Sequence, residues 1–238
     1  MRIGIIAALP GELKPLVRGW ESRKAGNGTR AWTRRADGDE WIAACSGMGA
    51  DAARRAFAEA EADGKLEMVL SVGWAGAVIP ELQPGEVRAL SVIVDAQTGE
   101  RFHLTDGPRS LAVVTLAQVA DAEEKLRVRN SYPNAAMVDM EAATIARLAQ
   151  MRGIPVACIK GVSDGASSKL PDLSPFVDSM GRLRMGPLLC SVALRPVQWP
   201  MLAQLGRDSS KAAYAIRELV LKFMQEKNVD RLNRTGAP

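Results

Sequence analysis

The sequence predicts an α/β protein with three layers, α/β/α, in which helices cover both faces of a central mixed, mostly parallel twisted sheet. Short, continuous apolar runs such as residues 3–9 are typical of strands that are buried on both faces of a sheet. These runs alternate along the chain with helical segments, an order that produces parallel strands joined by helical crossovers. With 238 residues, 47% of them hydrophobic, the chain is long enough to bury such a sheet in one domain.

Turn residues and apolar runs place the elements along the chain. The run at residues 3–9 ends at Pro10 and Gly11, and Gly153 and Pro155 end a later helix in the manner of a C-cap. The expected elements are, in order, a strand over 3–9, a hairpin of 31–35 and 41–45, a helix over 50–62, strands over 68–72, 87–94, 111–114 and 135–138, a helix over 140–151, and a strand over 155–162.

The C-terminal part of the chain, residues 173–226, is predicted to be mainly helical and to end in an amphipathic helix over 209–225. No internal repeat or low-complexity segment divides the chain, so residues 1–228 are expected to form a single domain. Residues 229–238 are expected to be a flexible tail.

The composition excludes several classes of function. The 31 basic and 27 acidic side chains give a net charge of +4 and are dispersed along the chain, so nucleic-acid binding is not expected. A single histidine, and three cysteines without a CxxC spacing, argue against a metal site and a disulfide framework. No apolar stretch reaches the roughly 20 residues that span a bilayer, and we expect a cytoplasmic protein. Chemistry must therefore rest on carboxylates, hydroxyls or backbone amides.

Three carboxylates, Glu12, Glu141 and Asp164, follow predicted strands. Ligands of α/β folds gather where strands end and helices begin, so these side chains are expected to meet at one edge of the sheet. Glu141 shares a helix face with Ile145 and Leu148, where a carboxylate is costly unless something binds it. Converging carboxylates raise one another's pKa, which lets a general acid stay protonated near neutrality. Each of the three alone also fits the first turn of a helix, whose dipole favours acidic residues.

Two glycine-containing turns, Ser46–Gly49 and Gly73–Gly76, are expected at the same edge. Glycine lets backbone amides approach a ligand closely, and a helix N-terminus suits an anion or a polar ring substituent. Neither turn has the spacing of the dinucleotide fingerprint or of the phosphate-binding P-loop. The sequence therefore disfavours a nicotinamide-dependent dehydrogenase and a P-loop nucleotidase.

Several segments carry a family pattern: residues 2–13, 46–49, 71–76 followed by 82–87, 138–142 and 161–164. Together they resemble the nucleoside phosphorylase superfamily, and within it they are most similar to the methylthioadenosine/S-adenosylhomocysteine nucleosidases. The resemblance implies cleavage of the N-ribosidic bond of an adenosyl-type purine nucleoside through an oxocarbenium-like transition state. It also implies that no metal, flavin or nicotinamide is needed, and that inorganic phosphate takes part only if the reaction is phosphorolytic.

The resemblance assigns a role to each carboxylate. Asp164 would protonate the purine at N7, and Glu12 would orient or deprotonate the attacking water. Glu141 would accept hydrogen bonds from the ribose hydroxyls, with Met140 packing under the sugar. The other residues expected to bind substrate are Ser46, Gly47, Gly73, Trp74, Ala75, Gly76, Gln118, Val119, Val138 and Asp139.

Two positions depart from the nucleosidase pattern. Trp74 stands where the nucleosidases commonly have a small Ser, and its ring either fills the core or reshapes the pocket. If the ring instead blocks the pocket, the chain would be a non-catalytic nucleoside-binding protein. The stretch 116–119 lacks the aromatic residue that usually stacks on adenine. The sequence therefore predicts which bond is cleaved better than which base is released.

Water is favoured over phosphate as the nucleophile. A phosphorolytic site needs fixed cations or several converging amides for the anion, and Glu12 would repel phosphate. A phosphate-dependent phosphorylase stays the alternative. Its candidate cation is Arg88, near the strand-edge Gly85, although an arginine at such a position is more commonly just solvated.

The C-terminal segments 176–178, 181–183, 194–196 and 205–209 resemble the hopanoid-associated branch of the family, whose members remove adenine from adenosylhopane. An apolar stretch over 187–202, edged by arginines, would pack on the sheet or at a subunit contact. Alternatively it would admit a lipid-like 5′ substituent or rest peripherally on the inner face of a membrane. Because relatives usually pair subunits, a homo-oligomer is also expected.

Overall fold

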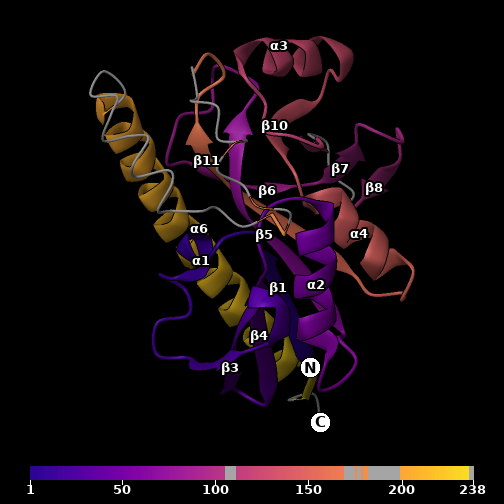
Figure 1. Cartoon of the computed structure of the whole chain (residues 1–238). Coiled ribbons are helices and arrows are strands. Elements are labelled where there is room, and N and C mark those ends of the chain that lie inside the picture. The colour runs from indigo at the N-terminus through magenta and orange to yellow at the C-terminus, as the bar shows by residue number, and fades with distance from the viewer. Residues whose placement is uncertain (105–110, 169–174, 176–177, 179, 182–198, 236–238) are drawn as a thin grey trace.

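The computed structural model describes residues 1–104, 111–168, 175, 178, 180–181 and 199–235, and in them eleven strands form one mixed sheet (Figure 1). Most strands follow one path, and β5 has an additional neighbour, β11 (Val156–Asp164), which in turn pairs with β6 (Val87–Leu90). The path is β2 (Glu21–Lys24), β3 (Arg30–Ala36), β4 (Asp39–Cys45), β1 (Arg2–Ala7), β5 (Met68–Ala77), β10 (Ala135–Asp139), β9 (Ala112–Thr115), β7 (Val92–Asp95) and β8 (Arg101–His103).

Helices cover both faces of this sheet (Figure 1). On one face, α2 (Ala50–Glu61) and α4 (Ala142–Gln150) bury Phe57 and Ile145 against Ile6 of β1. On the other face, α1 (Pro10–Leu13) and the long α6 (Trp199–Thr235) pack against the neighbouring Ile5. Consecutive residues of β1 thus enter opposite layers, as the two-residue period of a strand requires. The predicted three-layer fold with a mixed sheet is confirmed.

Parallel and antiparallel pairings are equally numerous in the described sheet. The five parallel pairs are β1 with β4 and with β5, β5 with β11, β9 with β10, and β7 with β9. The five antiparallel pairs are β2 with β3, β3 with β4, β5 with β10, β6 with β11, and β7 with β8. Most antiparallel pairs involve edge hairpins, where one tight turn joins neighbouring strands. The parallel strands β1, β5 and β11 carry the site described below.

Several boundaries differ from those that the sequence predicts. The expected strand over 87–94 is two strands, β6 and β7, which pair with different neighbours. Strands β2 and β8 and helix α3 (Ala122–Ser131) were not predicted, because they are short or polar and show no apolar periodicity. Helix α6 begins before residue 209 and continues to Thr235, past residue 228, where a tail was expected. Much of the apolar stretch over 187–202, with residues 182–183 and 194–196, lies outside the described residues.

Candidate active site

A cavity of about 1800 Å³ lies where β1, β5, β10 and β11 end, and Glu12, Glu141 and Asp164 all line it. Glu12 enters from α1 directly after β1, Glu141 is the N-cap of α4 after β10, and Asp164 is the last residue of β11. Eight more of the predicted substrate-binding residues line the same cavity, namely Trp74, Ala75, Gly76, Gln118, Val119, Val138, Asp139 and Met140. Residues distant in the chain thus meet at the strand ends, where α/β folds bind ligands.

Three backbone N–H groups hold the Glu12 carboxylate. Its Oε2 accepts hydrogen bonds from the N–H groups of Ala8 (2.8 Å) and Leu9 (2.7 Å), and its Oε1 accepts one from Trp74 (2.8 Å). Burial raises the pKa of Glu12 above its ordinary value, although these bonds and the charge of Lys160 oppose the rise. A fixed carboxyl with a raised pKa is suited to act as a general base near neutral pH.

Gly73 lies directly beneath this carboxylate. A Cβ built at Gly73 would lie 2.9 Å from Glu12 Oε1, and the φ of Gly73 is +144°, a conformation that side-chain-bearing residues rarely adopt. Glycine at this position therefore makes room for Glu12. Gly73 thus affects the site only through the space that it leaves for Glu12, and it is not among the residues lining the cavity.

Glu141 and Asp139 form the second acidic group of the site. Glu141 Oε1 accepts a hydrogen bond from the Gly49 N–H at 2.7 Å. Behind Glu141, Asp139 forms an ion pair with Lys160 (Nζ to Oδ2, 2.8 Å) that is almost fully buried. Burial, together with the negative charge of Asp139, raises the pKa of Glu141 to about 8. Lys160 was not predicted, and its ammonium limits the accumulation of negative charge at this end of the cavity.

The raised pKa of Glu141 predicts a loss of stability with rising pH. Its ordinary value is 4.5, so between about pH 4.5 and 8 the folded chain retains a proton that the unfolded chain has lost. This contribution to stability is fully present below the lower value and is lost as the pH rises through the upper one. Relative to Glu141→Gln, the free energy of unfolding of the wild type should fall by about a few kcal/mol over this range. Denaturant titrations of both proteins measure it, and a pH-independent difference would contradict the assignment.

Asp164 has a partner that the sequence analysis missed. Its Oδ2 accepts a hydrogen bond from the Lys125 Nζ, and its Oδ1 accepts one from the Ser163 Oγ at 2.6 Å. Lys125 projects from α3, and its side chain is only 1% exposed. The ammonium and the carboxylate are both buried, and each is the charged partner of the other. The candidate general acid of the site is thus part of an ion pair.

Trp74 forms part of the cavity wall. Its ring packs beside the core cluster that contains Leu13 and Leu16, and a Cβ at Gly11 would lie 2.9 Å from Trp74 Cη2. The half-buried indole also lines the cavity. The Trp74 side chain therefore packs against the hydrophobic core and also forms part of the cavity wall, and the cavity extends beside its ring.

The Ser46–Gly49 turn contributes to the site through its second half. Gly49 donates its N–H to Glu141, and Met48 lines the cavity. Ser46 and Gly47 are not among the lining residues. The Ser46 hydroxyl instead accepts hydrogen bonds from Thr29 Oγ1 and Arg55 Nε, each at 3.0 Å.

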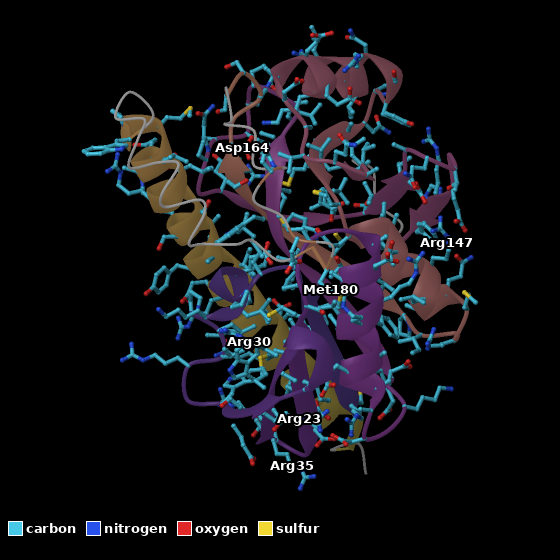
Figure 2. All side chains as sticks on the ribbon, in the orientation of Figure 1. Arg23, Arg30, Arg35, Arg147, Asp164 and Met180 are labelled. Carbon is cyan, nitrogen blue, oxygen red and sulfur yellow. The ribbon has the colours of Figure 1, made fainter. Side chains whose placement is uncertain are left out.

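The cavity continues along α6, beyond the carboxylates. Arg30 and Trp32 of β3 line this part, together with Leu202, Leu205 and Arg217 of α6. Figure 2 shows Arg30 well separated from Asp164 on the side of the molecule where α1 and α6 lie. The cavity therefore has carboxylates at the strand ends, and apolar and basic residues of β3 and α6 elsewhere in its wall.

Neither a metal centre nor a membrane-spanning helix is found in the described ranges. No three His, Cys, Asp or Glu side chains there are grouped as metal ligands would be. Likewise, none of the helices described, the long α6 included, combines the length and the apolar character needed to cross a bilayer.

Comparison with known proteins identifies the family. The chain is 27% identical to the 5′-methylthioadenosine/S-adenosylhomocysteine nucleosidase of Glaesserella parasuis serovar 5 over 202 residues, which cover 71% of this chain and 88% of that protein. Its fold is similar to a nucleosidase of the same kind from Neisseria meningitidis, solved with methylthio-immucillin-A (TM-score 0.70, 17% identity, 95% of this chain and 100% of that one). Futalosine hydrolase of Helicobacter pylori is a further structural neighbour (TM-score 0.70, 15% identity, 94% and 97%).

The sequence itself carries the family assignment. A family model described as the phosphorylase superfamily matches residues 2–127 and 104–184, which contain all three carboxylates. The predicted resemblance to this superfamily, and with it the prediction of an enzyme, is confirmed. The chain belongs to the phosphorylase superfamily.

Proposed function

We propose that this chain hydrolyses the N-ribosidic bond of an adenosyl-type purine nucleoside. The observation that carries the proposal is that Glu12, Glu141 and Asp164, which come from three separate elements, line one cavity. Hydrolysis of such a bond needs a proton for the leaving base, a held ribose and an activated water. One carboxylate is available for each of these tasks.

The surroundings of each carboxylate support its role. Asp164 would deliver a proton to the purine at N7. Glu141, anchored by the Gly49 N–H, keeps acceptor capacity for the ribose hydroxyls, and Met140 lies beside it in the cavity wall. Glu12 would take a proton from the attacking water, and its three backbone hydrogen bonds fix the direction of attack.

The environment of Glu12 supports water over phosphate as the nucleophile. The three N–H groups that could otherwise bind an anion already donate to this carboxylate. Arg88, the candidate cation for phosphate, pairs with Glu86 at 2.7 Å and is not among the lining residues. Both observations count against a phosphorylase, which stays the alternative.

One assay separates the three candidate functions. The purified chain is incubated with adenosine, methylthioadenosine and inosine, with and without phosphate, and free base is measured. Release without phosphate supports hydrolysis, whereas release only with phosphate supports phosphorolysis. Tight binding without release would support the non-catalytic alternative, although a cavity of about 1800 Å³ beside Trp74 argues against a blocked pocket.

For the 5′ substituent we propose an apolar, lipid-linked group, with adenosylhopane as the candidate substrate. Leu202, Leu205 and Leu221 of α6 line the cavity, which supports an apolar substituent. Contact of the apolar stretch over 187–202 with a membrane surface, and pairing of subunits, are further proposals of the same kind.

A charge placed in this wall should discriminate between substrates. Leu205→Glu should lower kcat/KM for a lipid-linked adenosyl substrate about tenfold or more beyond any loss on adenosine, because burying an apolar chain beside a carboxylate is costly. Ala203→Glu, an exposed position on the same helix outside the cavity lining, is the matched control. Equal losses on the two substrates would count against an apolar 5′ group.

A further inference from the structure

Lys125 is a buried lysine that contacts the candidate general acid. Its Nζ donates hydrogen bonds to Asp164 Oδ2 and, at 2.8 Å, to the carbonyl oxygen of Gly165. Of the α3 residues, only Lys125 and Val128 are buried, and the rest of the helix is largely polar. Burying a lysine costs free energy, so a placement that directs one of its donors at the candidate acid suggests a use in the reaction.

The fold makes room for this lysine at Gly76. A Cβ at Gly76 would lie 2.8 Å from Lys125 Cε, 3.1 Å from its Nζ and 3.2 Å from Asp164 Oδ2. Gly76, Lys125 and Asp164 all line the cavity. The family resemblance assigned Gly76 to the substrate, but its closest neighbours in the structure are this ion pair. Glycine on β5, a lysine on α3 and an aspartate on β11 therefore form one arrangement.

This arrangement changes where the proton for the leaving purine is stored. An ionised carboxylate has no proton to give, and Asp164 accepts hydrogen bonds on both of its oxygens. In the ion pair, the proton available for transfer is on the Lys125 ammonium. A purine that leaves from this site needs that proton, or one from solvent.

We propose that Lys125 is the proton source of the reaction and acts through Asp164; this rests on the proposed function. As the C1′–N9 bond breaks, its electron pair passes to the purine, and N7 takes a proton from the Asp164 carboxyl. Asp164 receives the proton of the Lys125 ammonium, which becomes a neutral amine. Water forms the new bond to C1′ and gives a proton to Glu12. Glu12 then releases this proton to solvent, and Lys125 takes one up from solvent. Lys125 is thus a positioning and proton-supplying residue, and Asp164 is the catalytic acid.

Charged groups on the helix of Lys125 and in the cavity wall also affect the pH dependence of the reaction. On its own helix, Glu124 pairs with Arg127, and Asp121 caps the helix N-terminus. The charged groups that share the cavity wall are Glu12 in α1, Lys14 and Arg18 after it, Arg30 and Arg34 on β3, Asp139 at the end of β10, Glu141 before α4, and Arg217 on α6. Asp139 is itself neutralised by Lys160. Each variant below is therefore compared with the wild type at matched pH, so that only the lysine changes.

The first test compares two leaving groups. Lys125→Met should lower purine release about 100-fold, the scale of an acid–base contribution. It should leave cleavage of the corresponding 4-nitrophenyl riboside within about threefold of the wild type, because nitrophenolate departs without a proton. Equal losses on both substrates would reduce Lys125 to a structural role, and unchanged purine release would overturn the proposal.

The second test separates charge from proton supply. Arginine keeps the positive charge but does not release its proton, so Lys125→Arg should stay as impaired as Lys125→Met on the purine substrate. With nitrophenyl riboside as the folding control, recovery of purine release by arginine would show that the charge alone suffices.

Asp164→Asn in the same assays shows whether a failure concerns Lys125 alone or also the role of Asp164 as the acid. If it retains purine release, Asp164 is not the acid and the inference about Lys125 fails with it, while the proposed hydrolysis stands; absence of purine release by the wild type would overturn the proposed function itself. If it loses purine release while Lys125→Met does not, only the inference about Lys125 fails.

Discussion

Asp164→Asn should lower the rate of purine release at least about 100-fold, because an amide can hydrogen-bond to N7 but cannot transfer a proton to it. Asn has nearly the shape of Asp, so the cavity keeps its form. The measurement is free base released per enzyme under saturating substrate, with cleavage of the 4-nitrophenyl riboside as a reporter of an intact site. Loss of both activities in a folded variant would mean that Asp164 holds the substrate and does not protonate it.

The same substitution leaves the Lys125 ammonium buried without its counter-charge. Asp164 is 7% exposed and Lys125 1%, and removal of one member of a buried ion pair typically costs about 3–5 kcal/mol. The matched control is Asp164→Asn combined with Lys125→Met, which removes the unpaired charge. Thermal unfolding should show a lower Tm for the single variant and partial recovery in the double one, with purine release low in both. A double variant as unstable as the single one would argue against this charge effect.

The fold and the three carboxylates could be predicted because each rests on a local pattern. Buried strands of an α/β sheet appear as continuous apolar runs, and Glu12, Glu141 and Asp164 follow such runs directly. The topological rule that ligands bind at strand ends then brings the three together without knowledge of distances. The family resemblance supplied the roles, which composition and spacing alone left open.

The two lysines of the site differ in how visible they are in the sequence. Lys160 interrupts the apolar strand over 155–162, and a charge in a buried strand signals a buried partner. Lys125 has no such signal, because it lies in a helix whose neighbours are polar and exposed. Helix α3 packs against β10, and only the structure reveals that the Lys125 ammonium reaches Gly76 on β5 and Asp164 at the end of β11.

The groups that pack against the glycines of the site could not be predicted from the sequence. The turns at 46–49 and 73–76 were expected to bring backbone amides against a ligand. In the structure, Gly73 makes room for Glu12, Gly76 for Lys125, and the Gly49 N–H holds Glu141. A sequence indicates that a backbone position must be free of a side chain, but not which neighbouring group fills the space.

Glu12→Ala should lower water-dependent purine release at least about 100-fold, because the attacking water loses its base. It also frees the N–H groups of Ala8, Leu9 and Trp74, which converge on the space that the carboxylate occupied. Converging amides of this kind bind small anions. Azide is an anionic nucleophile with no proton to remove, so added azide should restore part of the purine release and yield the ribosyl azide.

The matched control is Glu12→Gln, whose amide fills the same space and keeps azide out. Rescue of the alanine variant without rescue of the glutamine variant would show that Glu12 both activates water and excludes anions, which is the physical basis for hydrolysis over phosphorolysis at this site. Replacing azide with phosphate extends the comparison, since phosphate-dependent release by Glu12→Ala would show that one carboxylate separates the two reactions. Failure of azide in a folded alanine variant that still binds nucleoside would mean that Glu12 positions the backbone and does not serve as the base.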